Sequence, residues 1–65
     1  MELPQFEIRF KLHNKDFSTG VSRTFLSDAL QEAQLRQQSE NKRLPIRYYV
    51  LDTHTSVCYF LDLES

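Results

Sequence analysis

The chain has 65 residues, 40% of them hydrophobic, with five Phe and three Tyr, which predicts one globular domain over residues 1–65 rather than a disordered segment. Eight basic and nine acidic residues give a net charge of −1, which is poor support for a nucleic-acid-binding protein. No apolar run reaches the roughly 18 residues of a membrane span, and the first residues lack the pattern of a signal peptide, so we expect a cytoplasmic protein.

The first predicted strand covers residues 6–13, where apolar and charged side chains alternate. A polar turn is expected over residues 14–16, followed by a second strand over residues 17–25. Gly20, the only glycine of the chain, falls in the middle of this second strand and predicts a β-bulge or a close backbone approach. Together the two strands are expected to form a hairpin.

The one helical pattern lies over residues 26–40. Its apolar side chains follow the i, i+3, i+4, i+7 spacing of a single buried stripe, formed by Leu26, Ala29, Leu30 and Ala33. Gln37 continues this stripe with a polar side chain. Thr24 or Ser27 is the expected N-cap, and Asn41 is expected to adopt the left-handed conformation that ends the helix.

Residues 46–51 and 57–63 are rich in β-branched and aromatic types and predict a third and a fourth strand. The loop between them, residues 52–56, is expected to join them as an antiparallel hairpin. The element order β-β-α-β-β predicts an α+β fold, with one helix packed on one face of a four-stranded antiparallel sheet. The strand order, and the face of the last hairpin that meets the helix, stay open.

A single cysteine, Cys58, excludes a disulfide within the chain and fits a reducing compartment. With His13 and His54 it forms no spacing typical of a zinc site, so we expect neither a metal ion nor another cofactor. A domain below roughly 70–80 residues often depends on disulfides, metals or oligomerisation. We therefore expect association, either with a second copy or with another protein.

The last hairpin carries apolar or aromatic side chains on both faces, whereas one helix covers only one face of a sheet. An exposed aromatic patch is typical of an interaction site. The interpretation we favour is a small non-catalytic protein-binding protein of accessory or inhibitor type, such as phages and plasmids encode, acting through an exposed aromatic sheet face or an edge strand. Its expected contact residues are Glu7, Arg9, Arg47, Tyr48, Tyr49, Tyr59 and Phe60.

The alternative interpretation is a nucleic-acid-associated regulator that combines basic side chains with stacking tyrosines. Its candidate residues are Arg9, Lys11, Arg23, Lys42 and Arg43. We do not expect an enzyme, because the spacing of His54 and Cys58 gives no assurance that their side chains converge, and a pocket of about 300 Å³ or more for a small-molecule substrate is not expected in so short a chain. Leu35, opposite the apolar stripe, is either an exposed anchor or covered by the loop at Leu44.

Overall fold

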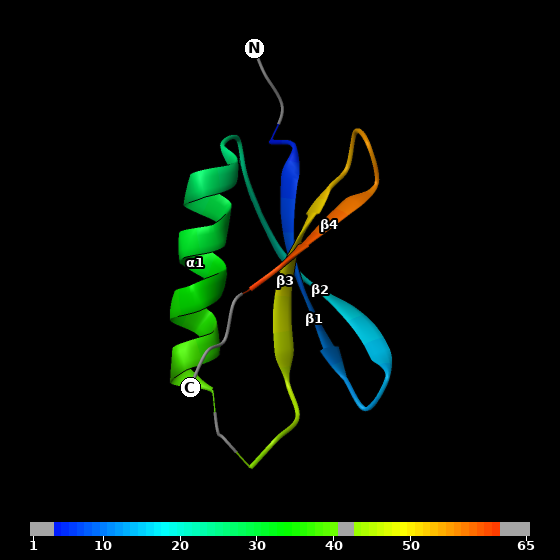
Figure 1. Ribbon diagram of the computed structural model, residues 1–65, viewed down its shortest axis with the longest axis vertical. Helices are drawn as coiled ribbons and strands as arrows, with labels where there is room; N and C mark the ends of the chain where they lie inside the picture. The colour runs from blue at the N-terminus through cyan, green and yellow to red at the C-terminus, as the bar shows by residue number, and fades with distance from the viewer. Residues whose placement is uncertain (1–3, 41–42, 62–65) are drawn as a thin grey trace.

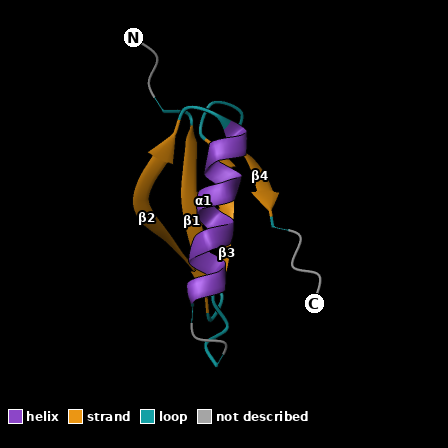
Figure 2. Cartoon of the chain, turned by 90° about the vertical axis from the view of Figure 1, so that its left-hand side faces the viewer, coloured by secondary structure: helices purple, strands orange, loops and turns teal. Residues whose placement is uncertain are grey.

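The computed structural model describes residues 4–40 and 43–61. Its elements in chain order are β1 (Phe6–Leu12), β2 (Lys15–Arg23), α1 (Leu26–Ser39), β3 (Arg47–Asp52) and β4 (Val57–Phe60). The strands form one antiparallel sheet in the order β2-β1-β3-β4, and α1 lies across one face of it (Figure 1 and Figure 2). The predicted fold class is confirmed, and the first and third strands are now placed at the centre of the sheet.

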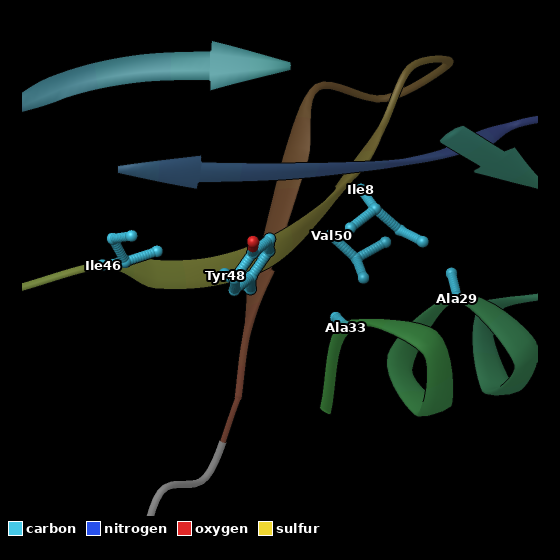
Figure 3. Packing of buried hydrophobic residues seen from close by; sticks show 6 residues of the cluster. All are labelled: Ile8, Ala29, Ala33, Ile46, Tyr48 and Val50. Carbon is cyan, nitrogen blue, oxygen red and sulfur yellow. The ribbon is translucent and has the colours of Figure 1, made fainter. Parts of the chain in front are cut away.

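The core lies between α1 and these two central strands. Ile8 of β1 and Val50 of β3 are fully buried and point toward Ala29 and Ala33 of the helix (Figure 3). Burying side chains of this size contributes about 1.5–3 kcal/mol each. The two leucines of the predicted stripe pack against the same cluster, so the stripe is confirmed. Strand β4 lies beyond β3, at the edge of the sheet opposite β2 (Figure 2).

The helix begins without a side-chain cap. Its N-cap residue is Phe25, in extended conformation, whose carbonyl oxygen accepts a 3.1 Å hydrogen bond from the Ala29 N–H. The prediction of Thr24 or Ser27 as N-cap is therefore wrong. The helix start is set by packing of its apolar face, which generally outweighs local preferences at helix ends. The expected C-terminal residue, Asn41, lies outside the described residues.

The turn of the first hairpin is shorter than predicted. Its turn consists of His13 and Asn14, both with positive φ (52° and 66°). Positive φ at both central residues is typical of two-residue hairpin loops, whose twist matches that of the flanking strands. As a result β1 ends at Leu12 and β2 already begins at Lys15, so the predicted polar turn over residues 14–16 is wrong in position.

The irregularity predicted at Gly20 is confirmed as a β-bulge. The pairing of β1 with β2 shifts between Ile8 and Arg9, where Thr19 and Gly20 have no paired residue. Gly20 has a φ of 78°, a conformation that L side chains rarely adopt. The Thr19 hydroxyl donates a 2.6 Å hydrogen bond to the Ile8 carbonyl oxygen and accepts one of 3.2 Å from the Val21 N–H. The bulge is therefore held by its own side chain.

The second hairpin is held by Asp52, the last residue of β3. Its carboxylate accepts hydrogen bonds of 2.9 and 3.0 Å from the Gln5 side-chain amide, and bonds of 2.9 and 3.3 Å from the backbone N–H groups of His54 and Thr55. The Gln5 bond, followed by the backbone bonds, lowers the pKa of Asp52. The carboxylate thereby ties the turn before β4 to the N-terminal segment.

Candidate protein-binding surface

Tyr48, expected as an exposed anchor, is only 7% accessible and faces α1. Its hydroxyl donates a 2.5 Å hydrogen bond to Glu40 Oε1, and its ring lies 5.4 Å from that of Phe10. Burial, with a smaller effect from the hydrogen bond, raises the pKa of Tyr48 to about 12. The expectation of Tyr48 as an exposed anchor is wrong, because its ring completes the core.

Tyr49 points to the opposite face, which α1 does not cover, yet it is only 3% accessible. Its hydroxyl donates a 2.5 Å hydrogen bond to Asp16 Oδ2 and accepts one of 3.2 Å from Arg9 Nε. Arg9 also lies 3.3 Å from Asp16 Oδ1 and donates a 2.7 Å hydrogen bond to Glu7 Oε1. Tyr49 is therefore not an exposed anchor, and Glu7 and Arg9 belong to an internal network rather than to a free charged rim.

The network explains why less apolar surface is exposed than expected. Hydrogen bonds with Glu7 and then Tyr49 raise the pKa of Arg9, and the bond from Tyr49 lowers that of Asp16. Burial and the bond to Asp16 raise the pKa of Tyr49. Lys11 Nζ lies 5.7 Å from the centre of the Tyr49 ring. Long cationic side chains can cover an aromatic ring while their charges stay near water.

Three exposed residues of apolar character lie together on β4. Phe60 is 63% accessible, Val57 is 45% accessible, and the free Cys58 is also exposed; we call these three residues the β4 surface. The Phe60 ring packs at 5.4 Å against Tyr49, whereas Tyr59 turns toward the core and is half-buried. Of the apolar anchors expected from the sequence, only Phe60 is therefore exposed. Val57 was missed because alternation groups it with Tyr59, although α1 does not extend over it.

The outer edge of β4 lacks the usual protection against strand pairing. The strand pairs with β3 on its inner side, through residues 57–60. Within that range it has no charged residue, no proline and no bulge, which are common means of blocking an edge. The predicted fourth strand extended to residue 63; residue 61 is not in a strand, and residues 62–63 lie outside the described part of the chain.

A helix side chain completes the sheet where β4 stops. Gln37 Nε2 donates a 2.9 Å hydrogen bond to the Ile46 carbonyl oxygen, and Gln37 Oε1 accepts one of 2.8 Å from the Tyr48 N–H. These main-chain groups lie on the same edge of β3 as Val50, which pairs with β4. Gln37 thus takes the place of further strand residues. A polar residue inside an apolar stripe was the signal in the sequence, but its partners were not evident from it.

A pocket of 610 Å³ opens where the β1–β2 turn, the start of β3 and the end of β4 meet. Its lining includes Lys11, His13, Arg47, Tyr48, Phe60 and Leu61. Its volume overturns the expectation that so short a chain has no room for a pocket of about 300 Å³. Arg47, expected at the surface, is exposed here.

The basic residues considered for nucleic-acid binding do not form one stripe among those that the structure describes. Arg9 is bound in the network around Tyr49, and Arg23 makes a 3.2 Å ion pair with Glu32 of α1, on the other side of the sheet. The remaining candidates are Lys11 on the uncovered face, Arg43 in the loop before β3, and Lys42, which lies outside the described residues.

The polar turn between β3 and β4 is organised by hydrogen bonds to the side chain of Asp52. The carboxylate of Asp52 accepts hydrogen bonds from its own turn, and His54 is exposed. Across residues 4–40 and 43–61, no group of three or more His, Cys, Asp or Glu side chains is placed to hold a metal ion.

The other exposed large apolar residues come from separate elements: Phe17 from β2, Phe25 from the residue before α1, Leu35 from α1 and Leu44 from the loop before β3. Leu35 and Leu44 are both exposed, so the loop does not cover Leu35. Isolated exposed apolar side chains are common on folded proteins and do not by themselves indicate a site. The β4 surface differs because its apolar residues lie along one open strand edge.

Comparison with known proteins finds no relative of this chain. No family model, curated protein or solved structure matches this chain. Within the described residues, α1 falls short of the length and apolar character needed to cross a membrane, and it is the one helix there.

Proposed function

We propose that this chain is a small non-catalytic protein-binding protein, of accessory or inhibitor type, that binds its partner along the outer edge of β4. The observation that carries the proposal is that β4 is an uncharged edge strand with exposed apolar side chains. An extended segment added to such an edge gains main-chain hydrogen bonds, and its alternate side chains contact both faces of the sheet. If the partner needs this segment for its own activity, its capture by β4 inhibits the partner.

The side chains of the β4 surface suit this mode of binding. Val57 lies opposite Asp52 and Phe60 opposite Tyr49, so they project on different faces of the strand. A partner strand about 4.8 Å away would contact both. Aromatic residues are enriched at the centres of interfaces. Arg47, which lines the same pocket as Phe60, supplies a rim charge that affects encounter rate and specificity more than affinity.

The partner is either a different protein or a second copy of this chain. A homodimer would pair two β4 edges about a twofold axis, and a different protein would occupy the same edge. The proposal also includes a reducing, cytoplasmic location. It is supported by the exposed free thiol of Cys58, since such thiols persist where glutathione and thioredoxin keep them reduced.

The variant Val57→Lys tests the proposal, because a lysine on an edge strand disfavours pairing with another strand. Val57 is partly exposed, so the lysine is accommodated without creating a buried charge. Gln31→Lys is the matched control, since it adds the same charge at an exposed position of α1. The molar mass in solution is measured by light scattering. Binding is measured by quantitative capture from the native cell with each immobilised chain.

We expect the wild type either to form a dimer or to retain a specific protein, and Val57→Lys to weaken that association by roughly tenfold or more. Gln31→Lys should behave as the wild type does, and circular dichroism should show both variants folded. The proposal is wrong if the wild type is monomeric and every protein that it retains is retained equally by Val57→Lys.

A further inference from the structure

Strand β4 is shorter than its neighbour β3, so the sheet becomes narrower beside the β4 surface. The pairing of β3 with β4 ends at Tyr49 and Phe60, whereas the pairing of β3 with β1 continues to Arg47 and Lys11. The 610 Å³ pocket opens at this step. Phe60 lines the pocket and also belongs to the β4 surface, so the two features are continuous. A partner segment that pairs with β4 therefore runs beside Phe60, which forms one wall of the pocket.

The charged groups that line the pocket all favour an anion. Lys11 and Arg47 are a directly opposite cross-strand pair, and like charges in this arrangement repel each other. His13 adds an imidazole, and no carboxylate is among the described lining residues. Within the described part of the chain, Arg47 makes no hydrogen bond or ion pair. An anion between the two cations would relieve their repulsion and gain charge-assisted hydrogen bonds from the guanidinium group.

Apart from the polar side chain of Asn14, the rest of the lining is apolar or aromatic. It includes the Phe60 ring, over which Lys11 Nζ lies at 5.6 Å, together with Tyr48 and Leu61. We infer that the pocket receives a carboxylate side chain of the partner, so that the segment bound along β4 is apolar or aromatic and is flanked by an acidic residue. This inference rests on the proposed function. It adds the chemistry of the partner, which the β4 edge alone does not specify.

Two capped peptides of equal shape test the inference, acetyl-Val-Thr-Phe-Asp-amide and acetyl-Val-Thr-Phe-Asn-amide. They differ only in whether the last side chain carries a charge. Each is titrated into the full ¹⁵N-labelled chain, and the backbone amide shifts of Lys11, Arg47 and Leu61 report on the pocket. Val57 reports on the far end of β4. The same titrations use Arg47→Gln and, as the matched control, Lys15→Gln, which removes one charge at an exposed position of β2.

We expect the Asp peptide to shift the pocket amides and to bind at least about threefold more tightly than the Asn peptide, a preference typical of a partly exposed ion pair. Arg47→Gln should remove this preference and Lys15→Gln should keep it. Raising the salt concentration should also reduce it, because salt screens such pairs.

Three results would overturn the inference: equal affinities for the two peptides, a preference that survives in Arg47→Gln, or no shift with either peptide. A larger shift of the pocket amides by phenyl phosphate than by the Asp peptide would also overturn it, since the pocket would then select phosphate. The proposed function is decided separately by Val57→Lys. If that variant loses association while the two peptides bind equally, the β4 edge is the binding site and the acidic specificity is wrong.

Discussion

The two edges of the sheet present opposite surfaces to a second strand. The β2 edge is nine residues long, begins with the charged residues Lys15 and Asp16, and is interrupted by the bulge at Gly20. The β4 edge is four residues long, has no charge and exposes Val57 and Phe60. Charges and bulges are recognised devices against unwanted pairing, whereas an apolar regular edge favours it. One edge of this sheet is thus blocked and the other is open.

A third stretch of edge strengthens this comparison. Where β3 extends beyond β4, its free main-chain groups at Ile46 and Tyr48 are bonded by the side chain of Gln37. Unpaired main-chain groups at a sheet edge are a general liability, and here two stretches are closed by different means. The contrast indicates that the open β4 edge is a specific feature of this molecule rather than a general property of its strands.

The variant Gln37→Ala should give the largest effect on stability, because it leaves the Ile46 carbonyl and the Tyr48 N–H without their partner. Leaving a buried polar group unpaired typically costs about 1–3 kcal/mol; because these two groups are only partly buried, we expect the lower limit for each and a fall in the free energy of unfolding of about 2 kcal/mol. Gln38→Ala, at the exposed neighbouring position, is the control and should change it by less than about 0.5 kcal/mol. Urea denaturation measures both. Equal losses in the two variants would show that Gln37 does not close the β3 edge.

The variant Gly20→Ala tests the closure of the β2 edge. A Cβ atom at this position would meet no atom within 4 Å, so the cost comes from the backbone alone, with its φ of 78°. The left-handed region disfavours an L residue by about 1–2 kcal/mol, and we expect a loss of stability of this size. Gly20→Asn should lose less, because asparagine tolerates this region better. Thermal unfolding measures the stability of the two variants relative to the wild type. Unchanged stability in Gly20→Ala would argue against the bulge.

Tyr49 connects the two edges, since its hydroxyl bonds to Asp16 on β2 while its ring packs on Phe60 of β4. Tyr49→Phe removes the hydrogen bonds of this hydroxyl with Asp16 of β2 and Arg9 of β1, keeps the ring contact with Phe60, and should cost about 1 kcal/mol. Tyr59→Phe is the control, because the Tyr59 hydroxyl has no hydrogen bond among the described residues, and it should be close to neutral. A double-mutant cycle with Asp16→Asn measures the coupling of Tyr49 to Asp16. A coupling energy of zero would contradict the bond across the sheet.

The sequence predicted the local features of this fold but not the contacts that join its ends. Alternation and helical spacing were sufficient for the strands and the helix, because each pattern lies within one element. The burial of Tyr49 was not predictable in this way, since its cover comes from Arg9 and Asp16, more than 30 positions away. The role of Gln37 likewise depends on the start of β3. Phe60 was identified correctly as an exposed residue, since β4 is an edge strand of the described sheet and α1 covers only the other face.

The variant Asp52→Asn should give the smallest effect at neutral pH, because asparagine keeps an acceptor oxygen for the turn before β4. The pKa of Asp52 in the folded chain is lowered from its ordinary 3.8, chiefly by the hydrogen bond from Gln5. A carboxyl group of this kind stabilises the fold fully above its unfolded pKa and loses this contribution as the pH falls through the folded pKa. Below about pH 4 the wild type should therefore lose stability more steeply than Asp52→Asn. Asp28→Asn, on the exposed face of α1, should keep the full decline. Urea denaturation at stepwise lower pH compares the three chains, and an unchanged acid slope in Asp52→Asn would show that the ionised carboxylate does not hold the hairpin that carries β4.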